Sequence, residues 1–222
     1  MLLGIDGSNW QGSIGWADVA AAGVSFAICK ASEGVTYADP WFARNWHGMA
    51  AAGLVRGSYH FAQPDLAAPE ADAAFWLACV QEAGGLLPGD LLALDVEAGS
   101  GDVSGWVKAC LRTVQAAVGF RPLLYSGGWY MQPHGLTHDA ELAEYGLWYA
   151  SYGAVPQTPP FWPFWAIWQY TCEGSVPGVA GPCDCNIANV ESVEQLRLYG
   201  LPAPNGFPPG EAAGASRPRP LP

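Results

Sequence analysis

The stretch LLALDVE, residues 91–97, is a short apolar run that ends in two acidic residues and is followed by glycines. Such a run predicts a strand buried on both faces. Because side chains alternate along a strand, Asp95 and Glu97 are expected to point the same way, with their Cα atoms about 7 Å apart. Partial burial and mutual repulsion would keep one carboxyl protonated while the other stays ionised. The pattern therefore favours an acid/base pair over two solvated loop acids.

Apolar runs and helical patterns alternate on both sides of this strand. Further strands are expected at residues 2–6, 24–30, 54–61, 122–126, 147–152, 164–170 and 183–187. Helices are expected at residues 16–22, 40–52, 69–83, 102–118 and 193–199. The regular order in the first half predicts a parallel sheet with right-handed crossovers, which eight strands can close into a barrel.

The barrel is preferred to an open doubly wound sheet, because no G-x-G-x-x-G motif follows the first strand. In a β/α barrel, chemistry gathers at the carboxyl ends of the strands. The residues expected there are Asp6, Lys30, Tyr59, Phe61, Asp95, Glu97, Tyr125, Trp148, Gln169 and Asp184. Several acids and aromatic rings with few cations favour a neutral sugar chain as the ligand.

The composition limits the other possibilities. The chain has 222 residues, half of them hydrophobic, which suits one domain with a large core. Its 20 acidic and 9 basic residues give a formal charge of −11, so a nucleic-acid partner is not expected. Residues 1–201 are expected to form the barrel, and the Pro/Gly/Ala-rich residues 202–222 a disordered tail or linker.

Targeting signals are not expected. The start, MLLGID, lacks the basic residues and the apolar core of a signal peptide. No segment approaches the roughly 18 consecutive apolar residues of a membrane span. The chain is therefore expected to be made in the cytoplasm and to have no membrane partner.

Six cysteines are present, and three of them fall inside apolar patterns where a thiol acts as a small hydrophobic group. The other three are Cys172, Cys183 and Cys185. Their spacing differs from that of zinc ligands, so neither a metal nor another cofactor is expected. A disulfide from Cys172 to Cys183 or Cys185 is left open, because a reducing cytoplasm would keep it reduced.

Six short motifs resemble, in order and spacing, those of glycoside hydrolase family 25, the Chalaropsis-type lysozymes of bacteria and phage endolysins. The motifs are GIDGS at 4–8, CKASEG at 29–34, GSYHF at 57–61, LDVE at 94–97, WQY at 168–170 and DCN at 184–186. The resemblance covers about residues 2–200. Gly7 stands where a β-branched residue is usual, Ser32 where Thr is commoner, and cysteines flank Asp184 where aliphatic residues are usual. None of these departures removes a carboxylate.

The resemblance implies a lysozyme (1,4-β-N-acetylmuramidase) that cleaves the β-1,4 bond between N-acetylmuramic acid and N-acetylglucosamine in peptidoglycan. The implied fold is α/β, a modified TIM-like barrel with eight strands and fewer than eight helices. The implied catalytic residues are Asp6, Asp95, Glu97 and Asp184, with Glu97 as the general acid/base. Three roles are left open: Asp95 stabilises the transition state, Asp95 orients the substrate's acetamido group, or Asp95 or Asp184 attacks the sugar directly. The stereochemical outcome is also left open.

The substrate-binding residues expected around these acids are Lys30, Glu33, Tyr59, Phe61, Tyr125, Trp148 and Gln169. Lys30 is expected to act mainly as a salt-bridge partner, and His60 as a core residue. Two other functions remain possible: a non-catalytic sugar-binding module, and a metal-dependent wall amidase or peptidase that uses His60, Asp95, Glu97 and a cysteine. The second lacks H-E-x-x-H or comparable ligand spacing.

The expected partner is the glycan strand of bacterial peptidoglycan, and the expected state is a monomer. A muramidase without a signal peptide that is rich in Gly, Ala and Pro fits a phage endolysin that reaches the wall through holin-type holes, or a prophage copy in a high-GC bacterium; the origin is left open. The negative charge would not attract the chain to an anionic wall, so the site itself or a separate module has to supply affinity.

Overall fold

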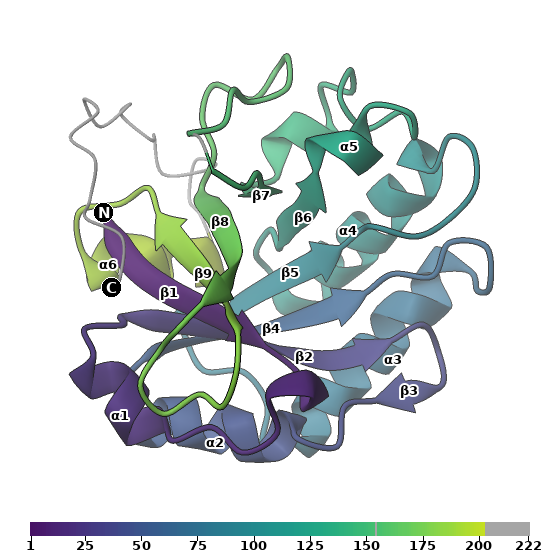
Figure 1. Ribbon diagram of the computed structural model, residues 1–222. Coiled ribbons are helices and arrows are strands. Elements are labelled where there is room, and N and C mark those ends of the chain that lie inside the picture. Colours follow the sequence, from purple (N-terminus) through teal and green to yellow (C-terminus); the bar gives the residue numbers. More distant parts are fainter. Residues whose placement is uncertain (154, 203–222) are drawn as a thin grey trace.

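The strands form a closed barrel in the computed structural model, which describes residues 1–153 and 155–202 (Figure 1). Around the barrel the order is β1 (Leu2–Gly7), β2 (Phe26–Glu33), β4 (Val55–Phe61), β5 (Leu91–Asp95), β6 (Leu123–Gly127), β7 (Leu147–Ala150), β8 (Ile167–Gly174) and β9 (Cys183–Ala188). Pairing of β1 with both β2 and β9 closes it. A short extra strand, β3 (Tyr37–Ala38), pairs only with the end of β2. The predicted eight-stranded α/β barrel is confirmed.

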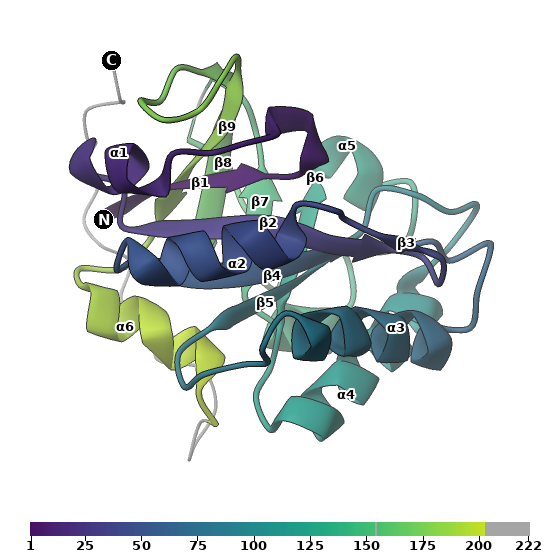
Figure 2. The ribbon, with the colours of Figure 1, turned by 90° about the horizontal axis from the view of Figure 1, so that it is seen from below.

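Helices cover only part of the barrel. The helices are α1 (Trp16–Ala21), α2 (Phe42–Ala51), α3 (Pro69–Glu82), α4 (Ser104–Val118), the single turn α5 (Gly128–Met131) and α6 (Val193–Arg197). Figure 2 shows α2, α3 and α4 along the outside of the strands from the first half of the chain. The second half connects its strands with loops and the 3-10 turn η2 (Leu142–Glu144). The described part of the chain therefore has fewer than eight α-helices, as predicted.

The helix expected from residue 40 begins two residues later. Asp39 Oδ1 accepts a hydrogen bond from the Trp41 backbone N–H at 2.8 Å, and this bond holds the turn that precedes α2. The sequence pattern did not predict β3, η1 (Asn9–Gln11) or α5, because elements of two to four residues carry too little periodicity. The expected tail lies outside the described residues, apart from residue 202.

Alternation along the strands divides the core into two layers. Inside the barrel, Phe26, Ile28 and Leu91 pack with other inward-facing side chains. The opposite faces pack against the helices, where Trp46 of α2 and Trp76 of α3 are fully buried. The interior is filled tightly, as expected for a barrel of this size, so the barrel is not a pore.

The amino-terminal mouth of the barrel is closed by α6 and the 3-10 turn η3 (Leu198–Gly200). Leu196 and Tyr199 belong to the apolar cluster inside the barrel. The Gly89 backbone N–H donates to the Gly200 carbonyl oxygen at 3.2 Å. A Cβ atom at Gly200 would lie 2.1 Å from the Asp90 carbonyl oxygen, so only glycine fits this contact.

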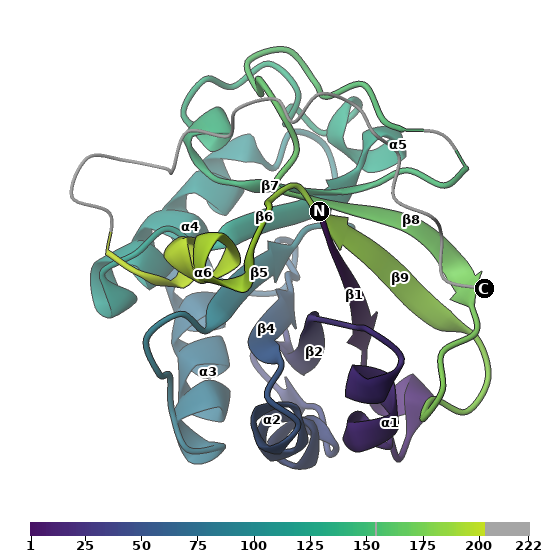
Figure 3. The same cartoon turned by 90° about the vertical axis from the view of Figure 1, so that its left-hand side faces the viewer.

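The last strand differs from the prediction of a wholly parallel sheet. β9 runs antiparallel to both of its neighbours, β8 and β1 (Figure 3). No helix joins β8 to β9, and strands in opposite directions need no crossover. Asp184, near the start of β9, lies directly opposite Asp6 of β1. The reversed strand thus brings Asp184 to the rim formed by the carboxyl ends of the other strands.

The cysteines and helices add two observations. All six cysteines are free, so neither disulfide that the sequence left open is formed. Cys172 is exposed, whereas Cys183 and Cys185 are buried in the outer apolar layer. Within residues 1–153 and 155–202, no helix combines the length and the apolar character that a membrane crossing requires.

A buried ion pair ties the start of β4 to the loop before β5. Arg56 donates from Nε to Asp90 Oδ1 at 2.9 Å and from Nη2 to Asp90 Oδ2 at 2.8 Å. The guanidinium carbon also lies 4.0 Å from the centroid of the Trp46 ring. Removing one member of such a pair leaves an unpaired charge in the core.

We therefore expect Asp90→Ala to reduce the free energy of unfolding by about 3–5 kcal/mol, which corresponds to roughly 10 °C in melting temperature. Glu141→Ala is the control, because the Arg112–Glu141 pair is exposed on the surface and contributes little. Differential scanning calorimetry of both variants measures the difference. Equal melting temperatures for the two variants would contradict this account of the buried pair.

Candidate active site

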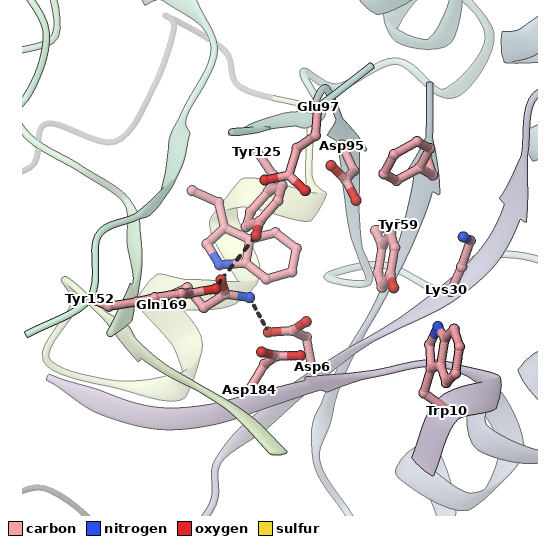
Figure 4. Close-up of a pocket in the computed structure, with 12 residues that line it drawn as sticks. Asp6, Trp10, Lys30, Tyr59, Asp95, Glu97, Tyr125, Tyr152, Gln169 and Asp184 are labelled. Atoms are coloured by element: carbon pink, nitrogen blue, oxygen red, sulfur yellow. Dashed lines mark hydrogen bonds between the residues drawn. The ribbon is translucent and has the colours of Figure 1, made fainter. Parts of the chain in front are cut away.

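An open pocket of about 290 Å³ lies at the carboxyl-end rim of the barrel (Figure 4). Its lining is Asp6, Trp10, Lys30, Tyr59, Phe61, Asp95, Glu97, Tyr125, Trp148, Tyr152, Gln169 and Asp184. Ten of these residues are in the set predicted from the sequence. Trp10 and Tyr152 were missed, and the predicted Glu33 is not in the lining.

Four acidic side chains reach the pocket from three strands. Asp6 and Asp184 form a directly opposed pair on β1 and β9. Asp95 is the last residue of β5, and Glu97 follows it after one buried residue, Val96. Val96 packs in the outer apolar layer while Asp95 and Glu97 face the pocket, as strand alternation predicted. The carboxyl groups converge on one space in Figure 4.

Asp6 is held by two amide side chains. Gln169 Nε2 and Asn186 Nδ2 both donate to Asp6 Oδ2, at 2.9 and 2.7 Å. The Gln169 amide is itself oriented, because the hydroxyl groups of Tyr125 and Tyr152 donate to its Oε1 at 2.9 and 3.0 Å. Asp6 is therefore fixed by a network of neutral groups that leaves its position little freedom.

Burial raises the pKa of all four carboxyl groups. For Asp6 and Glu97, the negative charge of Asp184 raises the pKa further. For Asp95, burial is the largest cause of the raised pKa, and the negative charge of Glu97 is the second. Burial raises the pKa of Asp184 to about 6. Four acids in one partly desolvated space cannot all ionise without cost, so the cluster retains protons closer to neutral pH than isolated carboxyl groups do.

Asp95 differs from Asp6 in its hydrogen bonds. Its Oδ1 atom is buried and has no hydrogen-bond partner in the part of the chain that the structure describes. A buried carboxylate oxygen without a donor is unfavourable in the free protein. Contact with a ligand therefore falls to the rest of the Asp95 carboxyl group, which lines the pocket.

Lys30 is held at the edge of the pocket by an ion pair. Its Nζ lies 2.6 Å from Glu33 Oε2 and 5.0 Å from the centroid of the Phe61 ring. Gln63 Nε2 donates to the other oxygen of Glu33 at 2.9 Å. Glu33 thus supports Lys30 from outside the lining. Lys30 is a salt-bridge partner, as predicted, although that partner is Glu33 and not one of the four acids of the pocket.

The aromatic residues divide into a buried floor and an exposed rim. Tyr125 and Trp148 are buried, with ring centroids 4.5 Å apart in an edge-to-face contact, and Trp148 Nε1 donates to the Asn186 side chain at 2.8 Å. Trp10 and Tyr152, by contrast, are 87% and 56% exposed. The floor gives the pocket its shape, and the rim offers aromatic faces to solvent.

The positions of Trp10 and Tyr152, the two pocket residues that the sequence analysis missed, have local signals in the sequence. Trp10 lies in η1, whose start is fixed by a capping box: Ser8 Oγ accepts from the Trp10 backbone N–H at 3.3 Å, and Gln11 Oε1 accepts from the Ser8 N–H at 2.9 Å. The S-x-x-Q pattern at residues 8–11, two residues after Asp6, marks this turn. Tyr152 lies two residues after the end of β7, as Glu97 lies two residues after the end of β5.

His60 lies on the face of β4 opposite to the pocket. Its Nδ1 is 2.8 Å from Ser32 Oγ, its Nε2 is 3.2 Å from Asp72 Oδ2, and its ring stacks on Trp76. All these side chains are buried, so His60 is a core residue, as expected. In the described ranges, no three His, Cys, Asp or Glu side chains are placed to hold a metal ion. The metal site proposed with His60, Asp95 and Glu97 is therefore wrong, because β4 separates the imidazole from the acids.

Comparison with known proteins gives a consistent result. The family model for glycosyl hydrolases family 25 matches residues 5–179. Lysozyme M1 of Streptomyces globisporus is 32% identical over 213 residues, which cover 88% of this chain and 70% of that protein. The N,O-diacetylmuramidase of Chalaropsis sp is 32% identical over 140 residues, 55% of this chain and 64% of that protein.

Solved structures share the fold. The bacterial lysozyme from Streptomyces coelicolor superposes with a TM-score of 0.79 and 30% identity, over 91% of this chain and 98% of that one. The CTP1L endolysin superposes with a TM-score of 0.74 and 29% identity, over 85% and 66% of the two chains. The family model covers most of the chain, and the barrel fold is shared with solved structures of lysozymes. This protein belongs to glycoside hydrolase family 25.

Proposed function

We propose that this protein is a lysozyme (1,4-β-N-acetylmuramidase) that hydrolyses the β-1,4 bond between N-acetylmuramic acid and N-acetylglucosamine in bacterial peptidoglycan. The observation that carries the proposal is the convergence of four carboxyl groups and several aromatic rings in one pocket of a family 25 barrel. The similarity to proteins named lysozyme and N,O-diacetylmuramidase supports this substrate.

Glu97 acts as the general acid and then as the general base. It is only partly buried, and burial together with the charge of Asp184 raises its pKa. The carboxylic acid donates its proton to the leaving glycosidic oxygen as the bond breaks. The resulting carboxylate then takes a proton from the water that completes hydrolysis.

Asp95 assists at the sugar that develops positive charge. Its carboxyl group lines the pocket and accepts a hydrogen bond from the acetamido N–H of the substrate, which orients the acetamido oxygen toward the anomeric carbon. Asp6 is less suited to this role, because Gln169 and Asn186 already donate to it. The carboxylate of Asp184 stabilises the cationic transition state from the other side of the pocket.

The remaining features support a monomer that acts on the glycan strand. The pocket is complete within one chain. The charge of −11 disfavours nucleic acid and does not attract an anionic wall, so contacts with the sugars provide the affinity. A protein of the same fold is named an endolysin, and for this chain release to the wall through holin-type holes stays part of the proposal.

The first test is Glu97→Gln. Because glutamine cannot donate the proton, we expect the release of reducing ends from purified wall to fall by about 10²–10⁴-fold. The melting temperature should not decrease, since the variant removes a carboxyl that is costly to ionise. Glu173→Gln, an exposed change on β8, is the matched control and should keep full activity. A wild-type protein that binds wall but releases no reducing ends would instead support the non-catalytic sugar-binding module.

The second test concerns pH and Asp184. Its pKa is about 6 in the folded protein against an ordinary 3.8, so the folded state binds the proton more tightly than the unfolded state does. This contribution to stability is complete below pH 3.8 and is lost as the pH rises through 6. We expect Asp184→Asn, compared with the wild type, to raise the melting temperature more at pH 7 than at pH 4. Thermal melts across this pH range measure the effect, and a constant difference between the two proteins would contradict it.

A further inference from the structure

A second pocket, of about 260 Å³, lies beside the catalytic pocket. Six residues line it: Gly128, Trp129, Tyr149, Ala150, Ser151 and Tyr152. They come from α5 and from the end of β7, which pairs with the strand that leads into α5. Tyr152 belongs to the lining of both pockets. The two pockets are therefore neighbours, with the Tyr152 side chain between them.

Exposed aromatic surface marks this second pocket. Trp129 is 66% exposed and Tyr152 is 56% exposed, although both side chains are large and apolar over most of their area. Tyr149 is buried and forms the base. Two exposed aromatic side chains that line one pocket form the kind of apolar, partly polar surface on which ligands bind.

Contacts within the chain restrain the Trp129 ring before any ligand binds. A Cβ atom at Gly127 would lie 2.4 Å from Trp129 Nε1, and one at Gly128 would lie 2.3 Å from the Tyr149 hydroxyl. The two glycines thus let the indole fold back over the backbone and let Tyr149 approach α5. Trp129 also makes an edge-to-face contact with Tyr130, at 5.6 Å between centroids. A ring held in this way loses little conformational entropy on binding.

The charges select the kind of ligand. None of the six lining residues carries a charge. Lys30, the basic residue in the lining of the catalytic pocket, lies on the side away from Tyr152 in Figure 4 and is paired with Glu33. An acidic peptide would leave its carboxylates without a cationic partner in the second pocket. A pyranose ring has apolar C–H faces and uncharged polar groups, which suit this lining.

We propose that the second pocket binds an uncharged N-acetylhexosamine ring of the same glycan strand, stacked on Trp129, beyond the sugars that flank the scissile bond. The inference rests on the proposed function, because it extends the substrate path from Glu97 past Tyr152. It makes Trp129 a residue that determines substrate length. Strands long enough to reach Trp129 are bound more tightly than short oligosaccharides.

The test compares Trp129→Ala and Trp129→Phe with the wild type on peptide-free glycan strands of graded length. We expect Trp129→Ala to raise KM about tenfold on long strands, the effect of losing one aromatic stacking contact, while kcat changes less than about twofold. Trp129→Phe should restore most of the affinity. On the shortest strands that are cleaved, all three proteins should have equal KM. Leu198→Ala removes an exposed apolar side chain at the opposite mouth and should have no effect.

Other outcomes would overturn the inference. A Trp129→Ala defect on peptide-bearing wall but not on peptide-free strands would mean that the pocket binds the stem peptide. An unchanged KM of Trp129→Ala on every substrate would contradict the proposed sugar-binding site. If the alanine variant melts early, calorimetric binding of long strands to Glu97→Gln and to Glu97→Gln/Trp129→Leu provides the second measurement. Weaker binding by the double variant supports the proposal, and equal binding of long strands by the two proteins contradicts it. A wild-type protein that releases no reducing ends refutes the muramidase function itself, whereas failure of the second pocket leaves wild-type activity intact.

Discussion

Mutual repulsion among four carboxyl groups in one partly buried space is the constraint that the rest of the structure has to satisfy. The barrel provides the rigidity, because Asp6 and Asp184 are fixed by the pairing of β1 with β9 and Asp95 by the pairing of β5 with β4. Neutral amides from Gln169 and Asn186 offset part of the cost at Asp6. The remaining cost appears as raised pKa values, and a raised pKa is what a proton donor at neutral pH requires.

Favourable packing at the opposite end of the molecule offsets the cost of gathering the four carboxyl groups. There α6 and η3 fill the amino-terminal mouth with Leu196 and Tyr199, and Arg56 and Asp90 form a buried pair beside them. The two ends of the barrel therefore have different tasks. Tight apolar packing and paired charges stabilise the closed end, while unpaired carboxyl groups and exposed aromatic rings occupy the open end.

Much of this arrangement could be predicted from the sequence, and the exceptions have physical reasons. The placement of Asp95 and Glu97 follows from alternation along a strand, which depends only on local geometry. The direction of β9 could not be predicted, because an alternating pattern reads the same in both directions. Whether Glu33 lines the pocket depends on its contacts with Lys30 and Gln63, and pair contacts of this kind leave no periodic signal.

The pairing of the first strand with the last has a consequence for synthesis. β1 and β9 are separated by about the whole length of the domain, and Asp184 reaches the rim only through that pairing. A nascent chain still attached to the ribosome, with β9 inside the exit tunnel, has an unclosed barrel and an incomplete set of acids. The active site is thus complete only after translation has passed the final strand.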